Sequence, residues 1–233
     1  MESFSYFLRL STAGLLLDVE SFRMQRDNPR TLRDGFVVVL LIGVLVGAAG
    51  IIGNLLSMLA MPDPQAFLDV IKSHLERAAF VTELQRGNPG FSLDPVFDQL
   101  TRLINVLRWS GLIGAVITPV VNLISWLVYG AVAHVAARML GGEGSFAQTL
   151  GCTALASGAN WLAVVQIVPF AQVAGTTILG LIGCYLGLRA AHHLPAWRAF
   201  WATLIGPIFL GLLLIVLGCG ALAVLIAVGQ GGR

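Results

Sequence analysis

The sequence predicts an all-α, polytopic membrane protein with five transmembrane helices and an extracytoplasmic helical hairpin between the first and second. Hydrophobic residues make up 57% of the 233 residues and charged residues only 11%, whereas soluble domains carry roughly a quarter charged residues. Too little polar surface is present to enclose a water-exposed core. The net charge of +2 gives no indication of nucleic acid binding.

Five apolar runs are long enough to cross a bilayer, which requires about 20 helical residues. The predicted spans are 35–60, 110–139, 146–168, 171–188 and 200–228. The second and fifth are longer than necessary, and each holds a proline, Pro119 or Pro207. Because proline removes a backbone donor and clashes with the preceding turn, we expect these two helices to bend or tilt.

Residues 1–34 form a predicted cytoplasmic amphipathic segment. Its apolar residues repeat near helical spacing at Phe4, Phe7, Leu8 and Leu15. This pattern is typical of an interfacial helix lying on the membrane, and it fits equally a helix packed under the bundle. Asn28-Pro29 predicts the next helix start, because asparagine caps helices and proline suits the first helical position.

The only large polar segment between spans covers residues 62–108. Asp63-Pro64 and Asp94-Pro95 predict two helix starts, and the GNPG at 87–90 separates them. Apolar residues repeat with helical period in both halves. We therefore expect a helical hairpin outside the bilayer, whose second arm continues directly into the second span.

Basic residues predict the orientation of the chain. Five spans place the amino terminus on one side with the loops after spans two and four, and that side holds eight arginines against six basic residues opposite. Basic residues favour the cytoplasmic side, so we expect a cytoplasmic amino terminus and an extracytoplasmic carboxyl terminus. Arginine supplies 13 of the 14 basic residues, a bias typical of GC-rich bacteria, which makes the inner (plasma) membrane the expected location.

The sequence lacks the motifs of the common enzyme classes. GxSxG, HExxH, Walker and dinucleotide-binding patterns are all missing. Cys152, Cys184 and Cys219 lie inside apolar runs without CxxC spacing, where thiols behave as small apolar groups. We predict no catalytic residue, no cofactor and no metal site. The alternative is an intramembrane enzyme centred on His134, but none of these catalytic motifs supports it.

The stretch YGAVAHVAARMLGGEGSFAQTL at 129–150 predicts the cytoplasmic end of the second span and the start of the third. His134 and Arg138 lie one turn apart near the helix end, where cations favour the helix dipole. Gly141 can adopt the left-handed conformation that ends a helix. Ser145 and Gln148 have the spacing of a capping box.

A basic rim at this end is the candidate surface for a lipid headgroup or a partner protein. Its predicted members are His134, Arg138, Glu143, Arg189, His192, His193 and Arg198. The alternative is that these residues only anchor the topology. Adjacent histidines project about 100° apart on a helix, so the pair at 192–193 is a poor metal chelate.

Three amides lie inside predicted spans: Asn122, Asn160 and Gln166. An unpaired amide is costly there, so we expect contacts between helices; the alternative is a transport path. No acidic residue lies within a predicted span, which argues against a proton-coupled carrier.

Glycine pairs predict close helix packing. Gly43 and Gly47 in the first span and Gly183 and Gly187 in the fourth form GxxxG patterns. Such patterns let two helix backbones approach each other.

Three segments carry a family resemblance. They are WLVYGAVAHVAARMLGGEGSFAQTL at 126–150, LLLDVESFRMQRDNPRTLRDGF at 15–36 and GLRAAHHLPAWRAFWATLIGP at 187–207. With the five-span layout, they resemble bacterial members of the YIP family, the Ypt/Rab-interacting membrane proteins, from Leu15 to Pro207. The resemblance implies five spans and a cytoplasmic amino terminus. Eukaryotic members are associated with Rab GTPases, but only 34 residues precede the first predicted span here, which argues against a Rab-type partner.

The expected function is a non-enzymatic membrane scaffold or adaptor of YIP type. It would organise lipids and other membrane proteins, further copies of itself included. The alternative is a transporter of a small molecule or lipid that uses the polar residues inside the bundle.

Overall fold

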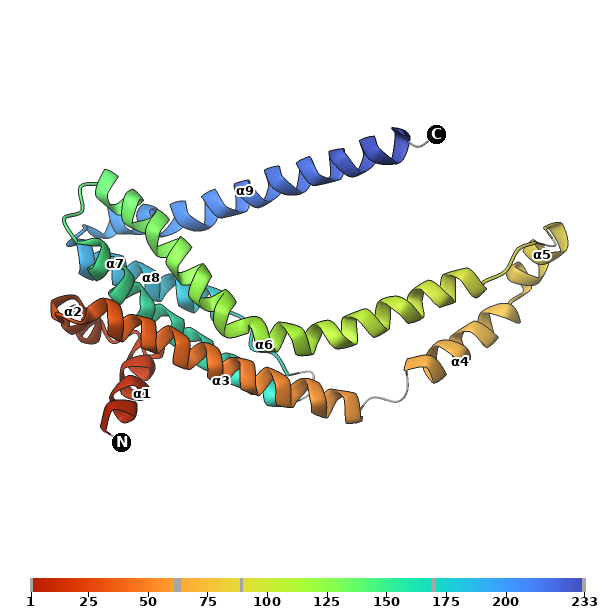
Figure 1. Ribbon diagram of the computed structural model, residues 1–233, viewed down its shortest axis with the longest axis horizontal. Helices are drawn as coiled ribbons and strands as arrows, with labels where there is room; N and C mark the ends of the chain where they lie inside the picture. Colours follow the sequence, from red (N-terminus) through yellow and green to blue (C-terminus); the bar gives the residue numbers. More distant parts are fainter. Residues whose placement is uncertain (1, 61–63, 89, 169–170, 232–233) are drawn as a thin grey trace. The chain divides into compact units, whose positions relative to one another are not determined.

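The computed structural model describes residues 2–60, 64–88, 90–168 and 171–231, and these residues form helices and turns with no strand (Figure 1). In chain order the helices are α1 (Glu2–Leu15), α2 (Val19–Asp27), α3 (Thr31–Ala60), α4 (Pro64–Glu76), α5 (Ala79–Gly87), α6 (Asp94–Met139), α7 (Phe146–Ala154), the 3-10 helix η1 (Leu155–Ile167), α8 (Thr176–His192) and α9 (Ala196–Gly231). The all-α prediction is confirmed.

Three helical segments among the described residues are long and apolar enough to cross a membrane: α3, α6 and the α7–η1 stretch Phe146–Ile167. They correspond to the first three predicted spans, and the third segment ends one residue before its predicted end. The fourth corresponds to α8, which has 17 residues and begins at Thr176, after Gly175 with φ 90°. The fifth lies within α9. The total of five spans stays a prediction.

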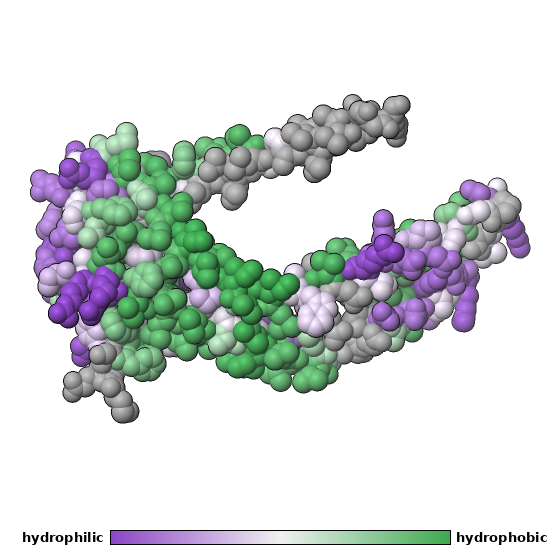
Figure 2. All heavy atoms as spheres, in the orientation of Figure 1, coloured by the Kyte–Doolittle hydropathy of each residue, from purple (hydrophilic) through white to green (hydrophobic). Residues whose placement is uncertain are grey.

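The chain divides into two compact units, which are described separately. Unit 1 comprises residues 1–44, 119–162 and 173–233, and unit 2 comprises residues 45–118 and 163–172. The boundary inside α6 falls immediately before Pro119. In unit 1, hydrophilic residues gather at the end that carries α2, while hydrophobic residues predominate on the rest of the face that Figure 2 colours.

Close helix crossings at glycines hold unit 1 together. A Cβ at Gly183 of α8 would lie 2.9 Å from the Ala156 Cα, and one at Gly187 would lie 3.0 Å from the Cys152 carbonyl oxygen. In the first span a Cβ at Gly43 would lie 2.8 Å from the Pro119 Cα. The predicted close approach is therefore confirmed at Gly183, Gly187 and Gly43, where a larger residue would collide with backbone atoms.

The third predicted span changes its helix type along its length. It begins as α7, and from Leu155 it continues as a 3-10 helix of 13 residues, although 3-10 runs longer than three or four residues are uncommon. The helix α1 crosses it where the type changes. A Cβ at Gly14 would overlap the Leu155 carbonyl oxygen, and one at Gly158 would overlap the Ser11 carbonyl oxygen. The indole Nε1 of Trp161 donates to Ser11 Oγ at 3.0 Å.

In unit 2 the polar segment forms α4, α5 and the beginning of α6. The first arm is broken at Ala78, whose extended backbone separates α4 from α5, a break that the sequence did not predict. The second arm runs without interruption into the second span, as predicted, because α6 extends from Asp94 to Met139. Lys72 of α4 forms an ion pair with Asp94 at the start of α6.

Candidate functional site

The helix α2 is fixed on α7 and α8 by its buried face. Asp18 caps it by accepting from the Glu20 backbone N–H at 3.3 Å and the Ser21 hydroxyl at 2.5 Å. Phe22 is fully buried and Gln25 is 2% exposed, and the Gln25 Nε2 donates to the Thr31 carbonyl at 3.0 Å. Of the two interpretations of the amino-terminal segment, the packed helix therefore applies to α2.

The turn between α6 and α7 has the predicted local structure. Gly141 adopts φ 88°, and the reciprocal hydrogen bonds of the Ser145–Gln148 capping box are both present. Two predicted rim arginines hold this turn: Arg138 Nη1 donates to the Gly142 carbonyl at 3.3 Å and Arg198 Nη1 to the Leu140 carbonyl at 3.2 Å. These two guanidinium groups are therefore engaged by the turn itself.

Two histidines of the predicted rim meet beside this turn through a threonine. The Thr149 Oγ1 lies 2.8 Å from His134 Nδ1 and 2.7 Å from His192 Nε2. The Gly144 backbone N–H donates to His192 Nδ1 at 3.1 Å. The residues come from α6, α7, α8 and the turn, so this histidine–threonine network fixes three helices relative to one another.

The network determines the protonation state of His192. Its Nδ1 accepts from a backbone N–H, so that nitrogen carries no proton, and Nε2 donates to Thr149 Oγ1. His192 is 1% exposed and lies four residues beyond the end of the predicted fourth span. Burial, and then the neighbouring His134 and Arg138, lower the pKa of His192 to about 4. His192, a member of the predicted rim, is therefore a buried side chain that is neutral at neutral pH.

A basic groove of about 320 Å³ lies between α2 and α8. We use this name for the surface lined by Val19, Arg23, Arg26, Leu186, Arg189, Ala190, His193 and Leu194. The α2 residues follow i, i+4, i+7 spacing, so they share one helix face. That face carries one apolar side chain, Val19, and two cations, Arg23 and Arg26.

Contacts inside the basic groove orient its charges. His193 has φ 54°, and its Nε2 lies 3.1 Å from Arg26 Nη1; since arginine only donates, the histidine nitrogen accepts. Arg26 also pairs with Asp27 at 2.7 Å, and this hydrogen bond raises the pKa of Arg26. Arg189 is exposed and makes no ion pair with another described residue, so its charge is available to a ligand.

The members of the predicted rim thus have different surroundings, and Arg138 and Arg198 hold the α6–α7 turn. Arg189 and His193 line the basic groove, whereas His134 and His192 belong to the buried network. The Glu143 side chain is exposed, and its backbone N–H donates to the His192 carbonyl at 3.4 Å. Sequence reasoning missed Thr149 as the link between the histidines. It also missed the groove face of α2, although the spacing of Val19, Arg23 and Arg26 could have revealed it.

The intramembrane amides occupy different surroundings. Asn160 is half-buried in η1, and its side chain makes no hydrogen bond to another described residue. Asn122 Nδ2 lies 3.6 Å from where a Gly43 Cβ would stand, and the Gln166 side chain is exposed. Within unit 2, Asn54 Nδ2 donates to the Gly111 carbonyl of α6 at 3.4 Å, an interhelical bond of the kind expected for the other amides.

The family comparison agrees with these features. The family model of the Yip1 domain matches residues 14–218, from the end of α1 into α9. Comparisons with curated proteins and with solved structures gave no match. Most of the chain is covered by the family model, and its long apolar helices are those of a membrane protein: the chain belongs to the Yip1 family.

Proposed function

We propose that this protein is a non-enzymatic membrane scaffold that organises anionic phospholipids, and through them membrane partners, at the basic groove. The observation that supports this most directly is the free guanidinium of Arg189 beside Arg23 and Arg26 on two helices packed against each other. A scaffold must hold its binding groups in place, and the packing of α2 on α8 does so.

The groove has groups for both parts of a phospholipid, the phosphate of the headgroup and the apolar carbons. Arginine offers several N–H donors in a planar fork that matches phosphate oxygens. Asp27 partly neutralises Arg26, and Glu20 lies 3.4 Å from Arg23, which leaves Arg189 as the principal cation. The apolar residues Val19, Leu186 and Leu194 in the same groove would contact the lipid carbons.

The test compares two arginine pairs for retention of an anionic lipid. The double variant Arg23→Gln/Arg189→Gln changes the groove, and its matched control Arg138→Gln/Arg198→Gln removes the same charge from the turn. Binding of phosphatidylglycerol is measured in nanodiscs or by native mass spectrometry. We expect the groove variant to bind this lipid about fivefold more weakly for each charge lost, since a near-surface charge contributes roughly 1 kcal/mol.

Salt provides an independent comparison. Raising ionic strength should weaken lipid retention by the wild type more than by the groove variant, because salt screens exposed charges. Equal retention by the groove variant and the wild type at low salt would contradict the proposal. So would purification in mild detergent as a monomer with no associated lipid or protein.

The proposal includes five spans, a cytoplasmic amino terminus and an inner-membrane location, supported by the distribution of arginines. Accessible cysteines can test it after Cys152, Cys184 and Cys219 are replaced. Glu143 and Glu83 are both exposed. A cysteine at Glu143 should be protected from an impermeant thiol reagent in intact cells, and one at Glu83 should react. The reverse pattern would invert the topology.

A transporter is the second candidate, and η1 is the feature that favours it. Irregular helices at membrane depth occur where they line a cavity or are covered by protein, and Asn160 lies within this one. A flux in proteoliposomes that Asn160→Leu abolishes without loss of folding would support transport. An undiminished flux in that variant would remove Asn160 from any path.

A further inference from the structure

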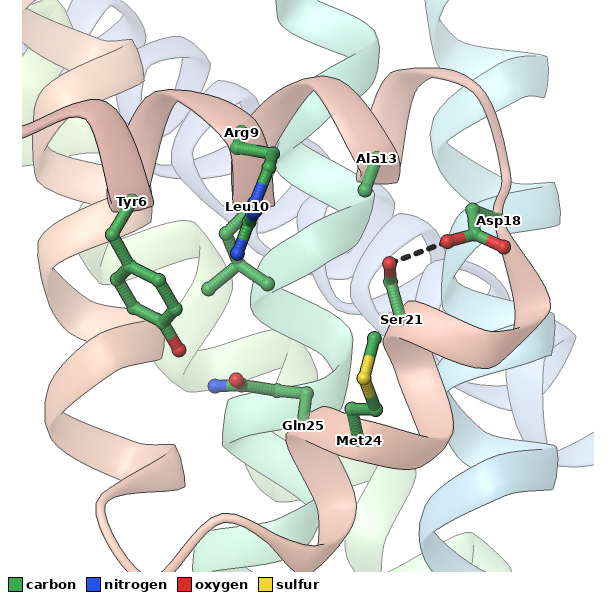
Figure 3. Close-up of a pocket in the computed structure, with 8 residues that line it drawn as sticks. All are labelled: Tyr6, Arg9, Leu10, Ala13, Asp18, Ser21, Met24 and Gln25. Carbon is green, nitrogen blue, oxygen red and sulfur yellow. Dashed lines mark hydrogen bonds between the residues drawn. The ribbon is translucent and has the colours of Figure 1, made fainter.

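A second cavity, separate from the basic groove, lies between α1 and α2. Its volume is about 440 Å³. Figure 3 shows the Arg9 side chain extending from α1 toward α2, with Asp18 and Ser21 at one side and Gln25 directed toward Tyr6. Both helices belong to unit 1, and they contact each other. The cavity therefore has polar groups on both of its walls.

Opposite charges line this cavity without pairing. The Arg9 guanidinium forms no ion pair or hydrogen bond with another described side chain. Asp18 accepts from Ser21 and from the Glu20 N–H, and the Ser21 hydrogen bond lowers the pKa of the Asp18 carboxyl, so it is ionised at neutral pH. A carboxylate has about four acceptor sites, and these contacts leave others available to a ligand.

Further acceptors line the cavity on the side away from Asp18, at Gln25 and Tyr6 (Figure 3). Gln25 is 2% exposed, and its Nε2 is engaged by the Thr31 carbonyl, which leaves its Oε1 as an acceptor. The Tyr6 hydroxyl lies 3.5 Å from Asp34 Oδ2 and has lone pairs of its own. The cavity thus combines one unpaired cation with several acceptors, an arrangement complementary to a ligand that carries an anion and an N–H donor together.

We propose that this cavity binds the zwitterionic phosphoethanolamine headgroup of a phospholipid, with the phosphate at Arg9 and the primary ammonium at Asp18. An ammonium has three N–H donors, as a lysine side chain does, and can donate to the free acceptor sites of the Asp18 carboxylate. The trimethylammonium of phosphatidylcholine has no N–H donor. Phosphatidylglycerol has no cation, so it would leave Asp18 facing a negatively charged ligand.

The surroundings favour a lipid over a free headgroup. Large apolar side chains of the two helices and of the turn between them stay uncovered by protein: Phe4 is 56% exposed, Leu16 78% and Met24 60%. Met24 also lines the cavity. In an amphipathic segment such residues enter the headgroup and acyl boundary, which is where a phospholipid headgroup is found.

The experiment measures the preference of the full-length protein for phosphatidylethanolamine over phosphatidylcholine by native mass spectrometry from mixed-lipid nanodiscs. The wild type should retain phosphatidylethanolamine preferentially. Asp18→Asn should abolish this preference while it keeps the helix cap, because asparagine caps as well as aspartate. Arg9→Gln should weaken binding of both lipids about fivefold, since both carry the phosphate.

Matched controls separate this site from the basic groove. Glu20→Gln and Arg102→Gln remove one charge each outside the cavity and should leave the preference unchanged, and so should the groove variant Arg23→Gln/Arg189→Gln. Equal retention of the two lipids by the wild type, or a preference that survives Asp18→Asn, would overturn the proposal. Displacement of the lipid by equimolar soluble phosphoethanolamine would overturn the lipid source in favour of a free zwitterion.

Discussion

The two units differ in their buried polar residues. The buried polar side chains among the described residues all belong to unit 1: Ser11, Ser21, Gln25, Thr31, Asp34, Thr149, Thr153, His192 and Thr203. In unit 2 the ion pairs are exposed, as between Lys72 and Asp94 or Arg86 and Glu83. Buried polar groups need specific partners, whereas exposed ion pairs contribute little.

This difference indicates in which unit polar contacts fix the positions of the helices. In unit 1 a helix cannot slide or rotate without leaving a buried donor or acceptor unpaired, which costs about 1 to 3 kcal/mol for each group. In unit 2 water can replace most of the polar partners. We therefore expect single substitutions to have large effects at the crossings and networks of unit 1, and small effects on the exposed contacts of unit 2.

The largest effect is expected where α1 crosses η1. Gly158→Ala would place a Cβ against backbone atoms of α1, including the Leu15 nitrogen at 2.6 Å, and overpacking of this kind costs about 1 to 3 kcal/mol. Gly114→Ala in unit 2 is the control, because nothing lies within 4 Å of its Cβ. Denaturation in detergent should show a lower midpoint for the first variant only. Equal midpoints would mean that α1 does not pack on η1.

The histidine–threonine network should give the next largest effect. Thr149→Val keeps the side-chain shape but removes the hydroxyl, so His134 and His192 each lose a partner, at a cost of about 1 to 3 kcal/mol. Thr149→Ser retains the hydroxyl and should remain close to the wild type. Lys72→Gln, which breaks an exposed ion pair of unit 2, should not change the unfolding midpoint measurably. A Thr149→Val protein as stable as the serine variant would contradict the network.

The pH dependence of stability should sharpen the comparison. The folded pKa of His192, about 4, lies below its ordinary value of 6.5, so its contribution to stability is present above pH 6.5 and is lost as the pH falls toward 4. Protonation would also remove the acceptor used by the Gly144 N–H. His192→Gln should lower the pH sensitivity of the unfolding midpoint between pH 7.5 and 5.0. His74→Gln in unit 2 should leave that sensitivity unchanged, and equal slopes in both variants would exclude His192 as its source.

The smallest of these effects concerns the intramembrane amides. Asn54→Leu removes the bond to the Gly111 carbonyl and should cost about 0.6 to 2 kcal/mol, the range for interhelical hydrogen bonds in membranes. Asn160→Leu removes a side chain that has no such bond among the described residues and should be nearly neutral. Unfolding titrations of both variants in one detergent would measure the two losses of stability. A larger loss at Asn160 than at Asn54 would show that Asn160 has a partner.

Much of the helical layout follows from the sequence. The capping box at Ser145, the helix end at Gly141 and the uninterrupted run from the polar segment into the second span are all present as predicted. Each depends on residues within a few positions of one another, and the local backbone responds to those residues directly. The Gly183–Gly187 pair is similar, because its spacing already places both glycines on one face.

Contacts between distant residues depended on the tertiary structure. Thr149 joins His134 and His192, which are 15 and 43 positions away, and Arg26 meets His193 across 167 positions. The same holds for the third span, which changes from the α-helix α7 to the 3-10 helix η1 where α1 crosses it. No periodicity in the sequence relates these residues, because membrane helices of similar hydropathy can pack in several ways. The choice among them comes from which buried polar groups find partners and which glycines let backbones approach.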